Sequence, residues 1–383
     1  MTKRLERPFA SFFQAGFECS SHRRADGVRL DLVRATGHDK HVLGDYRQCR
    51  ALGLRTVRDG LRWHLIEQGP GRYDWSSWMP ALEAAEEVGV EVIWDLFHYG
   101  SPDFFDQGAE DFADRFAEFA VAAVEIHQSV SDRPPLLCPM NEINFLSWAV
   151  EVGYFPATGL PTGDGLKDGG GLKERLVTAA IGGARAIRAA APDATLVWAE
   201  PLVNITTGSA HDDAVADAEA VRNYQFDALD WITGRTRPEL GGDPTLADIV
   251  GANFYPHNQW YHFGPPIPLG HHDYRPLAEM LIEIGTRYGK PVVITETGAE
   301  GSARAAWLHY VCSEVAEAIA VGADVRGICW YPITAYPGWD NSRHAEAGLL
   351  STITGDGTRH VDERLAAELK AQQERFALPA SSG

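Results

Sequence analysis

The feature that most constrains the fold is a repeated alternation of short apolar runs, rich in β-branched and aromatic residues, with longer amphipathic stretches of helical periodicity. This alternation is typical of βα units, in which parallel strands are joined by crossover helices. Eight strands are predicted, at residues 12–19, 56–63, 90–97, 136–140, 195–199, 249–255, 292–295 and 327–331. The helical patterns between them lie at residues 78–88, 112–127, 172–191, 214–233, 276–288 and 303–321. Eight strands with crossover helices close most naturally into a barrel, so the sequence predicts an α/β protein with a single (β/α)8 TIM barrel.

The length of the chain suits one large domain better than several small ones, since 383 residues with 45% hydrophobic content can bury a large core. We therefore expect the barrel to span residues 1–377 and residues 378–383 to form a frayed tail. Glycine and proline cluster at residues 153–171 and 264–270, which predicts long loops after the fourth and sixth strands. Such loops lie at the carboxyl ends of the strands, where barrel enzymes hold their active sites.

Charge and cysteine usage restrict the partners and the compartment. The formal net charge of −19 would repel a nucleic-acid backbone or an anionic membrane surface, and it favours a neutral or cationic small ligand. The five cysteines are widely spaced and include no CxxC pair, which indicates buried free thiols in a reducing compartment. No apolar run reaches the length of a signal peptide or a membrane span, so we expect a cytoplasmic protein. The oligomeric state stays open.

Two apolar strands stop abruptly on residues that are costly to bury. The strand at 136–140 is followed by Asn141 and Glu142, and the strand at 292–295 is followed by Glu296. A buried carboxylate without partners is expensive, so such residues usually mark a functional site or a buried ion pair. Two glutamates facing one barrel mouth can flank a glycosidic bond, one donating a proton to the leaving oxygen while the other attacks the anomeric carbon.

Other strand ends add polar or aromatic residues to the same predicted mouth. They are Arg58, His98, Asn253, Tyr255 and Trp330. Each has an equally good structural explanation when taken alone: Arg58 as a barrel ion pair, His98 as a satisfied buried histidine, Trp330 as core packing. Their shared placement at corresponding strand positions favours a site.

The environment of each glutamate is expected to set its role. A carboxylate close to a cation and to hydrogen-bond donors stays ionised, whereas a less compensated carboxyl keeps its proton. Arg58 and Tyr255 are the candidates for holding Glu296 ionised. Asn141 is expected to bind a sugar hydroxyl next to the reacting carbon.

The stretch Met140-Asn141-Glu142, taken with Ile294-Thr295-Glu296-Thr297-Gly298, resembles the catalytic pair of clan A glycoside hydrolases. Within the clan, the chain is most similar to glycoside hydrolase family 1, the β-glucosidase-like family. Further segments resemble that family in the same order along the chain, at residues 58–63, 97–102, 251–255, 330 and 348–350. The resemblance implies a (β/α)8 fold, retention of β configuration through a covalent glycosyl-enzyme, Glu142 as acid/base and Glu296 as nucleophile. It implies no metal and no organic cofactor.

The resemblance also implies a carbohydrate or glycoside substrate, contacted by Arg58, His98, Asn141, Tyr255 and Trp330. Two segments depart from the family. Residues 16–23 lack the glutamine that grips sugar hydroxyls, and Glu18 or His22 is a candidate to replace it. Residues 336–341 lack the family's Glu-Trp pair. Here Trp339 could stack on a sugar face and Asp340 could make the missing hydroxyl contacts. A glucose preference therefore does not carry over.

Three alternatives accompany the prediction of a retaining β-glycosidase. A transglycosidase would pass the same glycosyl-enzyme to a sugar or alcohol, and sequence does not separate it from a hydrolase. A carbohydrate-binding pseudoenzyme is disfavoured because both glutamates are present. A metal-dependent hydrolase is suggested by His257, His262, His271, His272 and Asp273, but these residues lack a strand-borne ligand set of the HxH kind.

Overall fold

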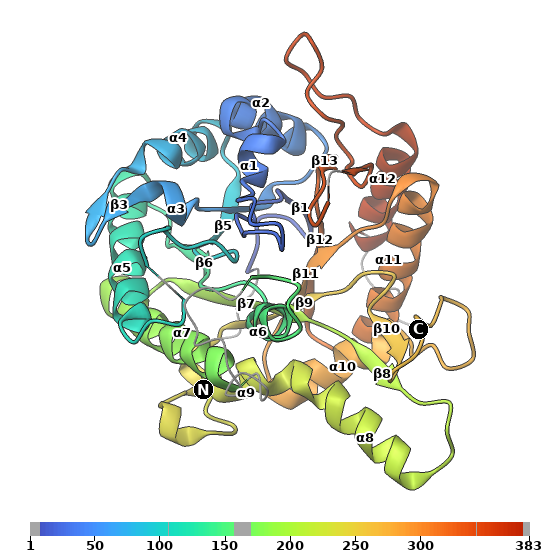
Figure 1. Ribbon diagram of the computed structural model, residues 1–383. Coiled ribbons are helices and arrows are strands. Elements are labelled where there is room, and N and C mark those ends of the chain that lie inside the picture. Colours follow the sequence, from blue (N-terminus) through green and yellow to red (C-terminus); the bar gives the residue numbers. More distant parts are fainter. Residues whose placement is uncertain (1–7, 106, 157–169, 342, 378–383) are drawn as a thin grey trace.

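The structure, a computed structural model, describes residues 8–105, 107–156, 170–341 and 343–377. Its centre is a closed barrel of eight strands, each parallel to both neighbours (Figure 1). In barrel order the strands are β1 (Phe13–Gly16), β2 (Thr56–Gly60), β5 (Glu91–Asp95), β6 (Leu136–Cys138), β7 (Thr195–Pro201), β9 (Ile249–Asn253), β11 (Val292–Thr297) and β12 (Val325–Trp330). All eight correspond to predicted strands, which confirms the (β/α)8 fold class. Boundaries differ at the ends: the second strand stops at Gly60 because Trp63 already begins a helix.

Helices surround the barrel (Figure 1). They are α1 (Leu32–Ala35), α2 (His38–Ala51), α3 (Trp63–Ile66), α4 (Met79–Val88), α5 (Phe112–Val130), α6 (Ile143–Glu151), α7 (Gly170–Ala190), α8 (Asp212–Asn223), α9 (Asp227–Ile232), α10 (Leu277–Tyr288), α11 (Arg304–Ala320) and α12 (Glu363–Ala377). The single helix predicted at 214–233 was wrong: a 3-10 turn at Tyr224–Phe226 divides it into α8 and α9. The tail predicted at 378–383 and most of the loop predicted at 153–171 lie outside the described residues.

In the ranges that the structure describes, three short strand pairs lie outside the barrel. β3 (Glu67–Gly69) pairs antiparallel with β4 (Arg72–Tyr73), and β8 (Asn204–Thr206) pairs parallel with β10 (Gln259–Tyr261). β13 (Tyr336–Pro337) pairs antiparallel with β14 (His344–Ala345). The β13–β14 hairpin belongs to the segment that follows the last barrel strand, so it extends the carboxyl-terminal face of the barrel.

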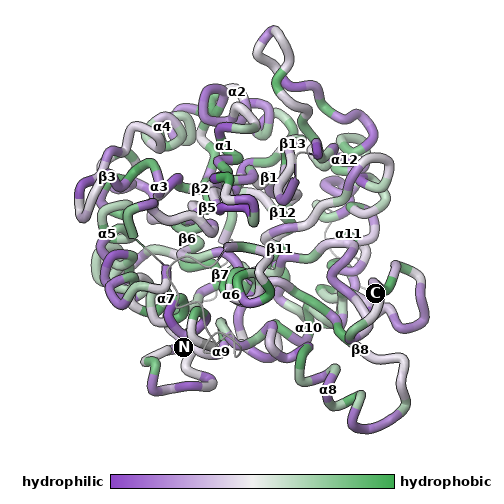
Figure 2. The backbone as a smooth tube through the Cα atoms, in the orientation of Figure 1, coloured by the Kyte–Doolittle hydropathy of each residue, from purple (hydrophilic) through white to green (hydrophobic). Residues whose placement is uncertain are grey.

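The hydrophobic core has two parts, because alternate side chains of a barrel strand point inward and outward. A small inner cluster includes Ile93, Val197 and Val293, and the larger cluster packs the strands against the helices. The barrel strands carry hydrophobic stretches, whereas hydrophilic segments are common in the peripheral loops (Figure 2). The five cysteines are buried and form no disulfide. Within the described ranges, no helix is long and apolar enough to cross a membrane.

Candidate active site

Glu142 and Glu296 both lie at the carboxyl-terminal mouth of the barrel. Glu296 is the second-to-last residue of the strand β11, and Glu142 comes between β6 and the first residue of α6. Glu142 adopts a left-handed backbone conformation with φ of 49°, and its N–H donates to the carbonyl oxygen of Ala199 on β7 (2.8 Å). A non-glycine residue in this conformation is costly unless the surroundings hold it, which is common at functional sites.

The carboxylate of Glu296 is compensated by a cation and a phenol. Arg58 Nη1 donates to Oε1 (2.7 Å), and the hydroxyl of Tyr255 donates to Oε2 (2.8 Å). Arg58 is completely buried on β2 and also forks onto both oxygens of Asp95 (2.9 and 2.7 Å). Burial by itself would lower the pKa of Arg58, but Asp95 and Glu296 raise it well above its ordinary value. Glu296 therefore faces a permanent positive charge.

The carboxyl group of Glu142 has no cation partner among the residues described. The amide of Asn253 donates to Oε1 (2.9 Å) and the hydroxyl of Tyr99 donates to Oε2. Burial, and next the negative charge of Glu296, raise the pKa of Glu142 to about 7, although both donors oppose the rise. Near neutral pH this group holds its proton for a large fraction of the time, as a general acid requires.

Two asparagine amides connect the two glutamates through the barrel. Arg58 Nη2 donates to Asn141 Oδ1 (2.7 Å), so the NH2 of Asn141 must point the other way, toward Tyr99 and His98. The hydroxyl of Thr295 on β11 donates to Oδ1 of Asn253 on β9 (2.7 Å), which leaves the NH2 of that amide for Glu142. The flip state of both amides is therefore fixed by their partners.

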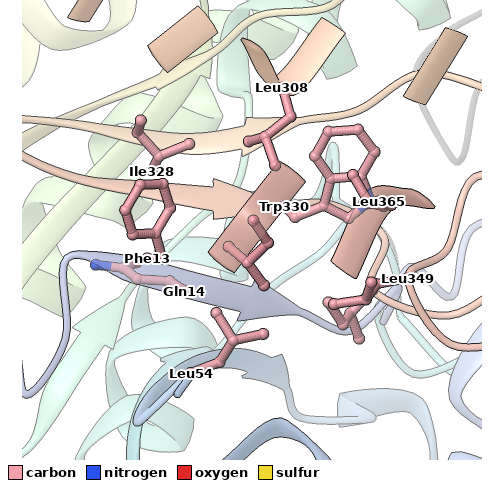
Figure 3. A pocket seen from close by; sticks show the side chains of 10 residues that line it. Phe13, Gln14, Leu54, Leu308, Ile328, Trp330, Leu349 and Leu365 are labelled. Carbon is pink, nitrogen blue, oxygen red and sulfur yellow. The ribbon is translucent and has the colours of Figure 1, made fainter. Parts of the chain in front are cut away.

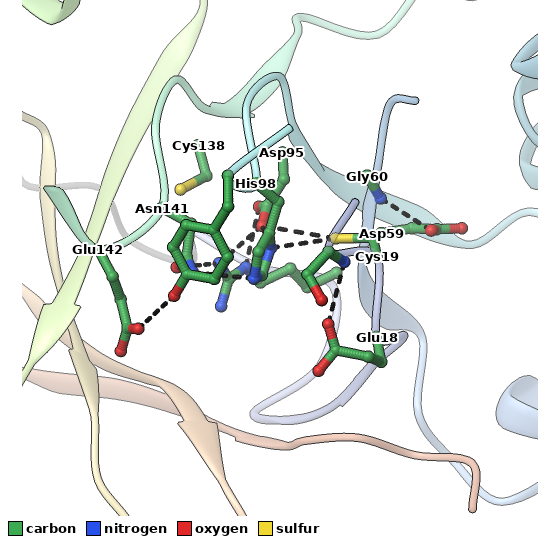
Figure 4. A network of polar contacts seen from close by, with 12 residues as sticks. Glu18, Cys19, Asp59, Gly60, Asp95, His98, Cys138, Asn141 and Glu142 are labelled. Atoms are coloured by element: carbon green, nitrogen blue, oxygen red, sulfur yellow. Dashed lines mark hydrogen bonds and ion pairs between the residues drawn. The ribbon is translucent and has the colours of Figure 1, made fainter. Parts of the chain in front are cut away.

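Both ring nitrogens of His98 are engaged by the protein. Nε2 lies 3.0 Å from the NH2 of Asn141 and must accept, so Nδ1 carries the hydrogen and donates to Asp95 Oδ2 (2.9 Å). The thiol of Cys19 also lies 3.1 Å from Nδ1. Figure 4 shows this network, with Asn141, His98 and Asp95 in one continuous set of contacts. The structure thus places His98 where it orients Asn141.

Trp330 faces away from the mouth. Its indole N–H donates to the carbonyl oxygen of Ala347 (3.0 Å), and its ring lines a small apolar cavity with Leu308, Leu349 and Leu365 (Figure 3). The predicted sugar contact of Trp330 therefore needs correction, since the ring belongs to the core between barrel and helices.

The next residue, Tyr331, takes the inward position because successive strand side chains point to opposite faces. Its ring lies 5.4 Å below the guanidinium carbon of Arg58 and nearly parallel to His98 (6.3 Å, 13°). A Cβ at Gly16 would come within 2.1 Å of the Tyr331 ring, so only glycine fits there. Strict alternation along β12 would have identified Tyr331 from sequence.

Trp339 lies in an aromatic wall at the mouth. Its ring packs between Tyr154 (6.1 Å, 27°) and His22 (4.5 Å), and it stands edge-on to Tyr99 (6.1 Å). Phe145 and Phe155 complete the wall. Its indole N–H donates to Ser20 Oγ (3.0 Å), and this hydrogen bond fixes the orientation of the ring. The residue remains partly exposed.

Asp340 lies next to this wall but is exposed. Burial, and second the negative charge of Asp340, raise the pKa of Tyr154 to about 12. Its Oδ1 accepts from the side chain of Asn341 (2.7 Å). The structure therefore places Asp340 at the outer rim, apart from the buried network of Arg58.

Besides Tyr331, sequence reasoning missed three further residues of the site. Asp95 pairs with Arg58, and Tyr99, at φ of 68°, reaches Glu142. Glu200 at the end of β7 accepts from the N–H groups of residues 143 and 144 (2.8 and 3.1 Å), and it fixes the start of α6 beside Glu142. Burial is the main cause that raises the pKa of Glu200 to about 8. A signal existed for Glu200, because it ends an apolar strand just as Glu296 does.

Two clusters of candidate metal ligands lie in the described ranges. Cys19, Asp95 and His98 lie close together, but Arg58 already occupies both oxygens of Asp95. His271, His272 and Asp273 lie on the loop between β10 and α10, with His272 exposed. His257 instead stacks on Tyr255 (5.9 Å, 11°). The histidines after the sixth barrel strand therefore do not join the two glutamates.

No protein-family model and no curated protein sequence matches the chain. Solved structures do match in fold. A β-glucosidase from Thermotoga maritima, in complex with glucoimidazole, is 13% identical with a TM-score of 0.74, covering 95% of this chain and 99% of that one. The AHE enzyme from Alicyclobacillus herbarius is 15% identical with a TM-score of 0.73, covering 97% and 100%. A β-glycosidase from Pyrococcus horikoshii is 17% identical with a TM-score of 0.72, covering 90% and 89%. The chain is thus similar in fold to β-glycosidases over nearly its whole length.

Proposed function

We propose that the chain is a retaining β-glycosidase that hydrolyses a β-linked glycoside through a covalent glycosyl-enzyme, with Glu296 as nucleophile and Glu142 as acid/base. The observation that carries the proposal is the unequal environment of two glutamates at one barrel mouth. Glu296 is bound by Arg58 and Tyr255, whereas Glu142 is held by neutral donors and has its pKa raised to about 7. The fold similarity to β-glycosidases supports the same assignment.

In the first step, Glu142 donates its proton to the glycosidic oxygen while a carboxylate oxygen of Glu296 attacks the anomeric carbon. The bond between that carbon and the aglycone oxygen breaks, and the aglycone leaves as an alcohol or phenol. Arg58 and Tyr255 bind the carboxylate of Glu296 and hold it in position for this attack.

In the second step, the ester at Glu296 no longer carries a charge. Because that charge is one cause of the raised pKa of Glu142, its loss lowers the pKa and favours the carboxylate of Glu142. Glu142 can then take a proton from water as the water attacks the anomeric carbon. The bond to Glu296 breaks, and both carboxyl groups return to their starting states.

Azide rescue of alanine variants tests the two roles separately. Glu296→Ala and Glu142→Ala should each lose nearly all hydrolysis of an activated aryl β-glycoside. With added azide, Glu296→Ala should give an α-glycosyl azide and Glu142→Ala a β-glycosyl azide, because azide attacks the sugar in the first variant and the glycosyl-enzyme in the second. Glu67→Gln is a control, since Glu67 is buried like Glu296 but accepts a hydrogen bond from the indole N–H of Trp63 (2.8 Å) outside the site. Wild-type activity in either alanine variant would contradict the assignment.

A further inference from the structure

Glu200 is a buried carboxyl group on β7 that takes no chemical part in the proposed reaction. It is 8% exposed and is the second-to-last residue of its strand. Its Oε1 accepts from the N–H of Ile143 (2.8 Å), and its Oε2 accepts from the N–H of Asn144 (3.1 Å). These two residues begin α6, the helix that starts directly after Glu142. A barrel strand therefore supplies the cap of the helix that follows the acid/base.

The backbone of residues 142–144 is held by two successive residues of β7. The N–H of Glu142 donates to the carbonyl oxygen of Ala199 (2.8 Å), and the next two N–H groups donate to Glu200. Glu142 is left-handed (φ 49°, ψ 58°), whereas the residues after it are helical. Successive N–H groups at such a change of hand form a concavity that binds anions. Glu200 fills this concavity, so it supports the costly conformation of Glu142.

The side chain of Glu142 would be the alternative cap. A residue at this position often turns its side-chain oxygen back to the N–H groups of the first helical turn. The carboxyl group of Glu142 instead faces the mouth, where Asn253 donates to Oε1 (2.9 Å) and Tyr99 donates to Oε2. Because Glu200 already satisfies the first N–H groups of α6, the carboxyl group of Glu142 stays available for chemistry.

α6 has a second attachment, which is independent of Glu200. The side-chain amide of Asn144 donates to the carbonyl oxygen of Gln225 (2.9 Å) and accepts from the N–H of Ala228 on α9 (3.3 Å). Figure 1 shows α6 over the middle of the barrel, beside β7. A variant of Glu200 keeps the attachment to α9, so we expect it to fold. It loses the bond between the start of the helix and the barrel strand.

We propose that Glu200 is a positioning residue for proton transfer: it holds the backbone of residues 142–144 so that the carboxyl group of Glu142 faces the glycosidic oxygen instead of the start of its own helix. This inference rests on the proposed role of Glu142 as acid/base. Glu200 itself does not touch the substrate. A change at Glu200 should therefore slow the steps that Glu142 serves and spare the attack by Glu296.

The test is the leaving-group dependence of Glu200→Gln. The amide keeps the shape but replaces one accepting oxygen by an NH2 group, which only donates, so one N–H group of α6 faces a donor. The substrates are aryl β-glycosides of the sugar that the wild type hydrolyses best. Their leaving groups run from 2,4-dinitrophenol, which departs without a proton, to phenol, which needs one. The quantity measured is kcat/KM, because it reports the cleavage step and not the breakdown of the glycosyl-enzyme.

The two ends of this series should respond differently. In Glu200→Gln, kcat/KM for the phenyl glycoside should fall about 100-fold, whereas that for the dinitrophenyl glycoside should change by less than about threefold. Glu67→Gln is the matched control, since Glu67 also accepts two N–H groups, from Gly71 (3.2 Å) and from the indole of Trp63 (2.8 Å). This control should leave the ratio of the two rates unchanged.

A second variant keeps the test decisive if Glu200→Gln fails to fold. Glu200→Asp retains both oxygens on a shorter side chain, and it should lower the phenyl rate selectively by about tenfold. An equal fall on both substrates would indicate a merely structural role and would overturn the inference. An unchanged phenyl rate in a folded variant would overturn it as well.

Failure of the proposed function gives a different result. A wild type that hydrolyses neither substrate would overturn that function, and so would a Glu142→Ala variant without a selective loss on the phenyl glycoside. Failure of the inference alone leaves the wild type and Glu142→Ala as expected and changes the outcome for Glu200→Gln. The two failures are therefore distinguishable in one series of assays.

Discussion

The two sides of the barrel mouth differ in how their side chains are held. Around the reacting carbon, Arg58, Asn253 and Glu296 are carried on barrel strands, and each has at least one partner on another strand. On the opposite side, Glu18 and Trp339 come from segments that follow β1 and β12 and are tied together through Ser20. The strand-borne side forms a connected hydrogen-bond network, whereas on the loop-borne side Nδ1 of His22 is buried without a partner among the described residues.

This difference indicates a division of labour. A network borne on rigid strands can hold reacting groups in one geometry, which chemistry demands. Loop-borne side chains can change from protein to protein without disturbing the barrel, which suits the choice of sugar. Substitutions on the strand side should therefore affect kcat strongly, and those on the loop side should mainly affect KM and selectivity.

The largest effect is expected for Arg58→Lys. A lysine cannot bind Asp95, Glu296 and Asn141 together, because it lacks the planar fork of five N–H donors. We expect kcat to fall about 1000-fold, with a loss of about 3 kcal/mol in the free energy of unfolding. Arg359→Lys is the matched control, since Arg359 is equally buried and forks onto Asp45 (2.7 and 3.0 Å) away from the mouth. Arg359→Lys should lose similar stability but retain kcat. Equal losses of kcat in both variants would show that the loss does not depend on the position of Arg58 at the mouth.

An intermediate effect is expected from pH. Glu142 must be protonated to act as the acid, and its pKa is raised to about 7, so kcat/KM should fall about tenfold per pH unit above that value. The check is a pH profile on a substrate with a poor leaving group, compared with Glu142→Gln assayed on a substrate whose leaving group needs no proton. The alkaline limb should vanish in the variant. If the same limb persists there, it belongs to another group.

The smallest effects separate the two tryptophans. Trp339→Ala should raise KM about tenfold with little change in melting temperature, because the ring is partly exposed in the mouth wall. Trp330→Phe should instead cost about 2 kcal/mol of stability and leave KM unchanged, because Trp330 fills the core beside Leu308 and Leu365. Thermal unfolding and steady-state kinetics on both variants measure this. A raised KM in Trp330→Phe would contradict the placement of Trp330 in the core and indicate that it contacts the substrate.

The barrel was predictable because its strands are buried on both faces and read as continuous apolar runs. The helix α2 was not predicted, since His38–Ala51 is mostly polar with few apolar positions. The division between α8 and α9 carries no glycine or proline to signal it. A weak hydrophobic pattern explains the failure at α2 but not at α6 and α12, which were also not predicted although they carry apolar residues.

Within the site, sequence predicted the residues that interrupt apolar strands. Arg58, Asn141 and Glu296 stand out because a polar group in such a position needs a reason. Tyr99 did not stand out, because it reaches Glu142 through a turn with positive φ that no periodicity indicates. Trp330 was chosen over Tyr331 because side-chain direction changes at every residue, so an error of one position reverses the face.

The central claim is that Glu296, and not Glu142, becomes covalently attached to the sugar. The most direct measurement is trapping with an activated 2-deoxy-2-fluoro β-glycoside of the preferred sugar, followed by peptide mapping by mass spectrometry. We expect one added glycosyl group, located on the peptide that contains Glu296, with time-dependent loss of activity. Attachment at Glu142, or turnover that releases the product with inverted configuration and leaves no adduct, would contradict it.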